Sequence, residues 1–227
     1  MASIFDEEVS LYGINQLTTL TIDLFPHRDK VTNQDMSRLA IKHIRHFMSL
    51  KSLNIDLRGC EKISNKGVSA LVDGGLSNLK CLRSLTLNFP LCAIGKGRVK
   101  SLACEGLQHL PQLTYLALKF EKCPYLTDKG VGSLASKELK YLTKLTSLTL
   151  GFSKCEGLTD AGIRILADEG LRNLIGLKSL DLKLKGSCNV TGEGGELFVI
   201  GNTEKSQAID TIQSEIGTMW TGLLLWR

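Results

Sequence analysis

The residues that decide the fold are 145–162, with the sequence LTSLTLGFSKCEGLTDAG. Apolar side chains occupy every second position here, at Leu148, Leu150 and Phe152. A period of two places these side chains on one face of a β-strand, because successive side chains of a strand point to opposite sides. The letters LTDAG that follow predict a turn into a helix, since a threonine hydroxyl can accept hydrogen bonds from the first helical amides.

The same pattern occurs six times at nearly constant intervals. Each copy opens with a leucine, carries a second leucine three positions later, and then places two further apolar residues at alternate positions. The openings lie 33, 32, 31, 32 and 32 residues apart, at Leu17, Leu50, Leu82, Leu113, Leu145 and Leu177. Because one strand, turn and helix cannot bury its own apolar face, units of this kind are stable only when they stack on one another.

The segments after the turns show a less regular apolar pattern than the strands. In the fifth copy, apolar residues are separated by three, five and three positions, at Ile163, Leu166, Leu171 and Leu174. A regular helix spaces its buried residues by three and four. The pattern therefore predicts a helix with a bend, and Gly170 weakens the helix at the same place.

The strand openings and the Leu-Thr-Asp-x-Gly turn resemble the leucine-rich-repeat superfamily, in its ribonuclease-inhibitor-like and cysteine-containing branches. The resemblance covers residues 17–190, although the period exceeds the roughly 20–29 residues typical of such repeats. It implies an α/β solenoid, or horseshoe, with a parallel β-sheet on the concave face and helices on the convex face. We predict three parts, namely an N-terminal cap (1–16), six repeats (17–190), and a degenerate repeat with a capping helix (191–227).

The C-terminal part leaves three interpretations open. An amphipathic helix is predicted by apolar residues at three- and four-residue intervals, namely Ile209, Ile212, Ile216, Met219, Trp220 and Leu223. This helix could cap the last repeat, dock onto a partner, or belong to a tail that is not native. We expect a cap, because a solenoid needs its end core covered.

Five of the seven cysteines occupy one position of the repeat. They lie ten or eleven residues after the opening leucine of their copy, at Cys60, Cys92, Cys123, Cys155 and Cys188. A metal or redox ladder is one interpretation. The resemblance to the cysteine-containing branch implies instead a structural position, which suits a small and weakly polar side chain. We therefore expect these thiols to be reduced and poorly reactive.

Composition excludes several classes of function. The net charge of +5 gives weak attraction to acidic partners but falls short of a nucleic-acid-binding signature. Residues 1–8 are acidic and lack the features of a signal peptide, and no apolar stretch approaches the roughly 18 residues of a membrane span. We expect a cytoplasmic or nuclear monomer that is not secreted and contacts neither nucleic acid nor membrane.

No motif for catalysis or metal binding is recognisable. His43 and His46 have a spacing that can hold a metal, but no further ligand lies near them in the sequence. We predict no enzyme, no metal and no cofactor. One enzymatic alternative comes from the superfamily, because the GTPase-activating proteins that act on Ran resemble this architecture and use an arginine on a repeat loop. Arg58 and Arg98 are the candidates in this chain.

The outward positions of the strands form the default interface of such a solenoid. One outward column passes from acidic to basic along the chain, and such a gradient can orient a partner of opposite polarity. We predict that a partner protein contacts Asp23, Asp56, Asn88, Tyr115, Lys119 and Lys183. The predicted function is a protein-interaction module. The alternative is a fragment or substrate-recognition part of a larger protein, such as an F-box-type receptor or a signalling protein, although no F-box is recognisable in residues 1–16.

The assigned strand register predicts unequal effects of substitution along the fifth strand. Replacing Leu148 or Leu150 with alanine should lower the free energy of unfolding by about 2–5 kcal/mol, as for other buried leucines. Replacing Thr149, which points away from the core, should cost far less. Denaturant unfolding measures all three variants, and equal losses would show that the register is wrong.

Overall fold

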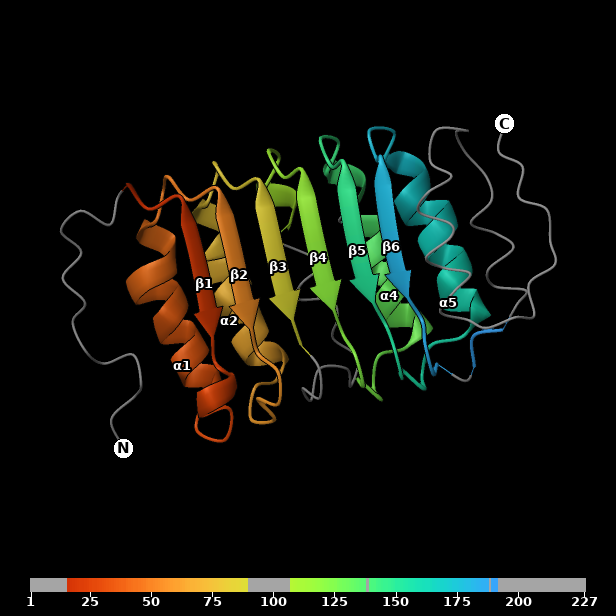
Figure 1. The fold of residues 1–227 in the computed structure, drawn as a ribbon, viewed down its shortest axis with the longest axis horizontal. Helices are drawn as coiled ribbons and strands as arrows, with labels where there is room; N and C mark the ends of the chain where they lie inside the picture. The colour runs from red at the N-terminus through yellow and green to blue at the C-terminus, as the bar shows by residue number, and fades with distance from the viewer. Residues whose placement is uncertain (1–15, 90–106, 138, 188, 192–227) are drawn as a thin grey trace.

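The computed structural model describes residues 16–89, 107–137, 139–187 and 189–191. They form a single sheet of six parallel strands in the order β1 to β6 (Figure 1). The strands are β1 (Thr19–Asp23), β2 (Ser52–Asp56), β3 (Ser84–Asn88), β4 (Tyr115–Lys119), β5 (Ser147–Gly151) and β6 (Ser179–Lys183). Each lies where the alternating leucines predicted it. The predicted N-terminal cap and C-terminal capping helix fall almost wholly outside the described residues.

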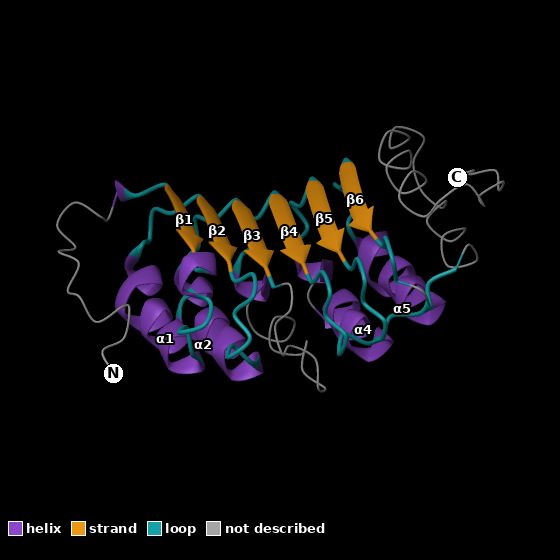
Figure 2. Ribbon diagram, turned by 60° about the horizontal axis from the view of Figure 1, so that its bottom comes forward, coloured by secondary structure: helices purple, strands orange, loops and turns teal. Residues whose placement is uncertain are grey.

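The helices cover one side of the sheet and leave the other side open (Figure 2). The α-helices are α1 (Asn33–Arg38), α2 (Asn65–Gly74), α4 (Asp128–Lys137) and α5 (Asp160–Ile165). Two of them continue as wider π-helical turns at Leu39–His43 and Leu166–Gly170. Short 3-10 turns complete the layer, namely Phe25–His27, Ile44–His46, Leu76–Asn78, Leu107–His109, Leu139–Tyr141 and Leu171–Asn173. The fold is that of an α/β leucine-rich-repeat solenoid.

The wider turns explain the irregular apolar spacing of the helical segments. Leu166 and Leu171 are five residues apart and bracket the π-helical stretch, which adds the extra residue that a regular α-helix would not accommodate. Gly170 lies at the end of that stretch, where a Cβ would come within 3.0 Å of the Ala135 Cβ of the preceding repeat. The predicted bend is thus a local widening that brings neighbouring helices close together.

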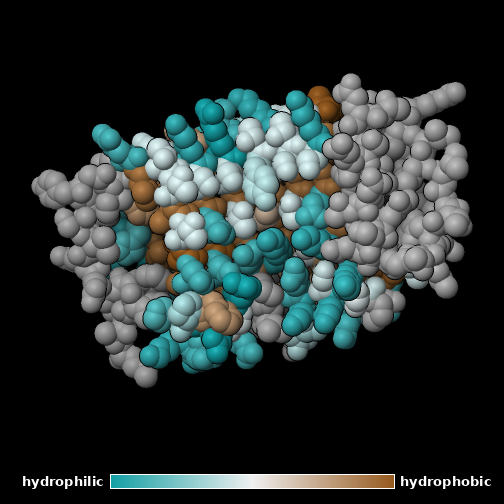
Figure 3. All heavy atoms as spheres, in the orientation of Figure 1, coloured by the Kyte–Doolittle hydropathy of each residue, from teal (hydrophilic) through white to brown (hydrophobic). Residues whose placement is uncertain are grey.

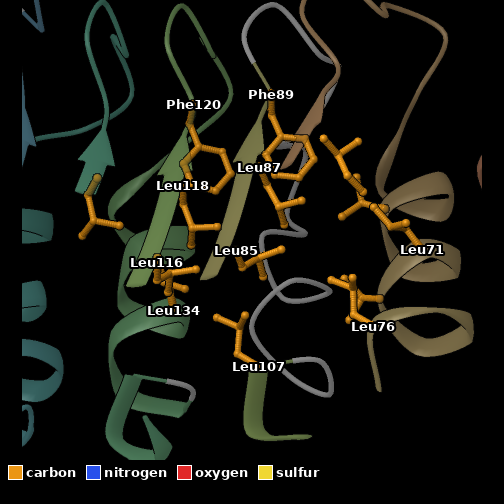
Figure 4. Close-up of a cluster of buried hydrophobic side chains, with 14 of the residues drawn as sticks. Leu71, Leu76, Leu85, Leu87, Phe89, Leu107, Leu116, Leu118, Phe120 and Leu134 are labelled. Carbon is orange, nitrogen blue, oxygen red and sulfur yellow. The ribbon is translucent and has the colours of Figure 1, made fainter. Parts of the chain in front are cut away.

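The strand leucines pair in register along the sheet. Leu116, Leu148 and Leu180 are neighbours in one row, and the next row contains Leu118 and Leu150. In β5 these leucines are fully buried. At the end of the strands, phenylalanine rings stack on one another, with centroids 5.6 Å apart between Phe89 and Phe120 and 6.0 Å apart between Phe120 and Phe152 (Figure 4). In-register pairing therefore converts a sequence repeat into continuous rows of core side chains.

In the described residues, the Leu-Thr-Asp-x-Gly turn and its variants connect neighbouring repeats. The Asp128 carboxylate accepts hydrogen bonds from the backbone N–H and the hydroxyl of Thr159, at 2.8 and 2.7 Å. The Thr159 hydroxyl in turn accepts from the N–H of Ala161 and caps α5. Asn33 makes the same type of bridge to Ser64 in the first two repeats. The motif therefore encodes a helix cap and a contact between repeats in the same few residues.

The glycine of the motif makes room for this bridge. A Cβ on Gly67 would lie 2.6 Å from the Asn33 side-chain oxygen, closer than real Cβ contacts. A Cβ on Gly162 would collide with the Asp128 carboxylate in the same way. The N–H of Gly67 instead donates a hydrogen bond of 3.0 Å to Asn33. The glycine at this position is required by packing between repeats.

The cysteine position is a buried hydrogen-bond donor between repeats. The thiols of Cys123 and Cys155 donate to the carbonyl oxygens of Phe89 and Phe120, at 3.3 and 3.0 Å. In the sixth repeat the position belongs to Ser187, whose hydroxyl donates to the Phe152 carbonyl at 2.7 Å. The assignment of Cys188 to this column is therefore wrong, because the loop keeps its length and a serine can make the same hydrogen bond. Cys92 and Cys188 themselves lie outside the described residues.

The bridge at the turn predicts a graded series of stabilities. Replacing Asp128 with alanine removes two hydrogen bonds to a charged acceptor, and the free energy of unfolding should fall by about 1.5–3 kcal/mol. Asp128→Asn should lose clearly less, because Asn33 makes this bridge in the first repeat. Chemical denaturation compares the two variants with Lys129→Ala, an exposed neighbour. Equal stability of the alanine and asparagine variants would contradict the role of the bridge.

Burial predicts slow modification of the column thiols. Burial raises the pKa of Cys60 and of Cys155 to about 11, so both stay protonated near neutral pH, where the thiolate is the reactive form. A thiol reagent on the native protein should modify the exposed Cys81 first and reach Cys60, Cys123 and Cys155 only after denaturation. Peptide mapping by mass spectrometry identifies the sites. Modification of Cys155 as fast as Cys81 would contradict this prediction.

Candidate interaction surface

The outward side chains of the six strands form the open side of the sheet, which we call the sheet face. In-register pairing arranges them in three columns. The column at the carboxyl end of the strands contains Asp23, Asp56, Asn88, Lys119, Gly151 and Lys183. Figure 3 shows this face as a mixture of hydrophilic, intermediate and hydrophobic residues. The structure therefore aligns five of the six predicted contact residues in this column, and the sixth, Tyr115, lies in the column at the amino end of the strands.

The middle of the sheet face is lined by small side chains. Ala117, Thr149 and Gly151 point outward from β4 and β5, yet all three are buried by their neighbours. Tyr115 begins β4 beside them and is 37% exposed. It is the one large aromatic side chain among the described outward positions, and therefore the residue on this face best suited to anchor a partner.

Three side-chain acceptors on the sheet face have no donor among the described residues. They are the Oδ1 atoms of Asn54, Asn88 and Asp181, each buried. A buried acceptor without a hydrogen bond costs about 1–3 kcal/mol, so three of them on one face are costly. Only Asn88 was predicted as a contact residue. Asparagine is disfavoured in strands, and the occurrence of Asn54 and Asn88 within strands was the available sequence signal.

The acidic end of the column has a structural role as well as a charge. The Asp23 and Asp56 carboxylates accept hydrogen bonds of 3.0 Å from the backbone N–H groups of Phe25 and Arg58, two residues later. Asp56 is 9% exposed and also binds the Arg58 guanidinium, with Nε 2.7 Å from Oδ2. Its charge is therefore largely compensated within the chain. Asp23 is exposed and is the more available carboxylate for a partner.

An aromatic side chain in contact with two arginines adjoins this acidic end. The guanidinium carbon of Arg28 lies 4.6 Å from the centre of the Phe25 ring, and that of Arg58 lies 5.5 Å from it. Phe25 is 43% exposed. Cations over an aromatic ring attract its negative face, so the ring and both arginines are held together. Sequence analysis did not identify this cluster, because its members come from two different repeats.

The basic end of the column is more open. Lys119 and Lys183 are half-buried, and Gly151 between them carries no side chain that would separate them. The Lys183 ammonium lies 3.7 Å from the Asp181 carboxylate. That pair is partly exposed and contributes little to stability. The two lysines are therefore available to a carboxylate or another acceptor of a partner.

Of the two arginines named for the enzymatic alternative, Arg58 alone falls within the described residues. Arg58 is held by Asp56 and by the Phe25 ring, and Arg98 lies outside the described residues. In the described part of the chain, no three His, Cys, Asp or Glu side chains gather to hold a metal ion. Within the same residues, no helix is long and apolar enough to cross a membrane.

Comparisons with known proteins assign no family to the chain. No protein-family model matches the sequence, and no curated protein matches it. Among solved structures, the chain is similar to one in the crystal structure of the Rad7 and Elc1 complex in yeast, with 18% sequence identity and a TM-score of 0.30. The match covers 82% of this chain and 61% of the other. The chain thus spans less than two thirds of the protein that it resembles.

Proposed function

We propose that this chain is a protein-interaction module that acts as a monomer and binds a partner protein on its sheet face. The observation that carries the proposal is the set of buried, donor-free acceptors on Asn54, Asn88 and Asp181. These side chains can rotate toward a partner and accept hydrogen bonds from its N–H or O–H groups. Such hydrogen bonds would remove the energetic cost of the unsatisfied acceptors.

The charges along the same face determine how a partner would be oriented. Asp23 is exposed near the first strand, and Lys119 and Lys183 lie near the last strands. A partner with a basic group toward the N-terminal repeats and an acidic group toward the C-terminal repeats would match both ends. Such complementarity contributes mainly to orientation and to the rate of association. Tyr115 provides the apolar contact between the two ends.

The finer assignments belong to the same proposal. Buried thiols that donate to the preceding repeat support membership of the cysteine-containing branch of leucine-rich-repeat proteins. Free cysteines fit a reducing compartment, cytoplasmic or nuclear. The alternative function is the substrate-recognition part of a larger assembly. In the yeast complex the resembled chain occurs together with a second protein, Elc1, and the alternative would use the same face.

A comparison of two charge-reversal variants tests the proposal. The intact protein is used to recover partners from lysate of its source, and the bound proteins are identified by mass spectrometry. Lys119→Glu/Lys183→Glu should lose a partner that the unmodified protein retains, because both substitutions reverse the basic end of the sheet face. The matched control is Lys42→Glu/Lys129→Glu, which changes the net charge equally on exposed positions of the helical layer.

The identified partner then allows a quantitative measurement. Tyr115→Ala should weaken binding by about 1 kcal/mol or more if the tyrosine is an anchor, as measured by calorimetry with the purified partner. Retention of the partner by the sheet-face variant, with loss in the helical-layer control, would move the interface to the helices and contradict the proposal.

A further inference from the structure

The two edges of the solenoid differ in charge. Five loops lead from the helical layer back to the strands, at residues 44–51, 76–83, 107–114, 139–146 and 171–178. We call the surface that these loops form the amino edge, because they enter the amino ends of β2, β3, β4, β5 and β6. The five loops contain no aspartate and no glutamate. In a chain with 28 basic and 23 acidic residues, five loops without a carboxylate are an uneven distribution of charge.

Four of the five loops of the amino edge carry exposed lysines or arginines, and the loop at residues 107–114 carries none. Seven exposed lysines and arginines lie on the edge, namely Arg45, Lys51, Lys80, Arg83, Lys144, Arg172 and Lys178. The Lys80 ammonium donates a hydrogen bond to the carbonyl oxygen of His109, and the Lys144 ammonium donates one to the side-chain oxygen of Gln112. Both acceptors are neutral groups. Arg172 forms an exposed pair with Asp168 of the adjoining helical turn, at 3.6 Å. Among the described residues, Asp168 is the one carboxylate that forms a recognised ion pair with a cation of this edge.

Helix dipoles account for only part of this pattern. The helices end at the amino edge, and cations are favoured near the negative end of a helix within about one turn. That explains Arg45 and Arg172, which lie in the last helical turns. Lys51, Arg83 and Lys178 lie beyond those turns, directly before the first residue of β2, β3 and β6. The helix ends do not require a positive charge there.

The opposite edge has no such bias. The loops that lead from the strands to the helices carry charges of both signs. Carboxylates occur in four of the five described loops, at Asp29, Glu61, Glu121 and Glu156. The neighbouring cations in those loops include Lys30, Lys62 and Lys122. Within the described loops, the amino edge therefore differs from the opposite edge in its lack of carboxylates rather than in its number of cations.

Apolar side chains project from the same basic edge. Ile175 is 85% exposed, the highest value among the exposed large hydrophobic residues, and Met48 is 56% exposed. Both lie four residues before the first residue of a strand, so they occupy equivalent positions in the first and last loops of the edge. Ile175 stands between Arg172 and Lys178, and Met48 between Arg45 and Lys51. Exposed apolar side chains flanked by cations are typical of contact with a lipid interface.

The geometry of the edge matches an extended surface. In-register pairing places successive loops at the same height, with neighbouring strands about 4.8 Å apart. Figure 1 shows these loops side by side along one edge, and Figure 3 shows hydrophilic side chains projecting along it. The basic groups extend both along the row of loops and across it, from the helix ends to the strand starts. A single extended peptide would cover one line of this area, whereas a lipid surface would cover all of it.

We propose that the amino edge is a peripheral membrane-contact surface that binds anionic phospholipid headgroups. The lysines and arginines attract the negative surface, while Ile175 and Met48 enter the interfacial region. The attraction acts within about 10 Å at 0.1 M salt, so only this edge takes part. The strands then stand upright on the membrane, and the sheet face stays open to a protein partner. The sequence predicted no membrane contact because no apolar stretch is long enough to span a membrane. The peripheral contact proposed here differs from that prediction, and it requires no spanning segment.

Vesicle binding tests the proposal with the full chain. The protein is sedimented with vesicles of phosphatidylcholine alone or mixed with phosphatidylserine, at low and at high salt. We expect binding only to the vesicles with phosphatidylserine, and weaker binding at high salt. Lys51→Glu/Arg83→Glu/Lys178→Glu should reduce the partition coefficient about tenfold or more, since each basic group near an anionic surface contributes to binding.

A matched variant separates the edge from the net charge. Lys30→Glu/Lys62→Glu/Lys185→Glu makes the same charge change at exposed positions of the opposite edge, and it should leave binding within about twofold of the unmodified protein. Met48→Ser/Ile175→Ser should weaken binding without changing its salt dependence. Circular dichroism confirms that each variant is folded, which separates loss of binding from loss of structure.

Three outcomes would overturn the proposal. The first is equal binding to both kinds of vesicle, or to neither. The second is equal loss of binding in the two charge-reversal variants, which would assign the effect to net charge. The third is tighter binding to polyglutamate or to a DNA duplex than to the vesicles, with no effect of the Met48 and Ile175 substitutions, which would assign the edge to a soluble polyanion.

Discussion

Contact between neighbouring repeats is the interaction on which the rest of the structure depends. A strand buries its leucines only because the strands beside it are in register, and a turn is held by the side chain of the repeat before it, as Asp128 holds Thr159. The thiol of Cys155 adds a third contact to the preceding repeat. In such a chain of nearest neighbours, stability is approximately a sum over repeats and their interfaces. Damage to one turn therefore weakens two repeats.

The same register creates the two surfaces for which we propose a binding role. It places the outward residues of six strands in columns, so that Asp23 and Lys183 lie at opposite ends of one column. It also aligns the loops at each end of the strands, so that cations separated by about 32 positions become neighbours. Two partners of different chemistry could thus be held at right angles, one on the face and one on the edge. Neither surface requires a change in the shape of the solenoid.

Much of the fold was predictable because repeats amplify weak signals. The alternating leucines identified all six strands and their register, and the burial of Leu148 and Leu150 agrees with that register. The loops were harder to predict. Ser187 takes the position assigned to Cys188, because a hydroxyl and a thiol make equivalent hydrogen bonds. The candidate site was predicted only as a set of outward positions. That Asp56 is tied to Arg58 could not be predicted, since it depends on a local turn and on burial.

The sequence by itself determined the strand order, the core rows and the helix caps. These are properties of one repeat and its copies, and a fixed period of about 32 residues specifies them without further information. Only the tertiary structure decided which polar groups lack partners, which carboxylates are compensated, and which cations share an edge. The cluster of Phe25 with Arg28 and Arg58 and the exposure of Ile175 depend on the placement of side chains and loops in space. Such properties arise from proximity between repeats, which the order of residues along one chain does not express.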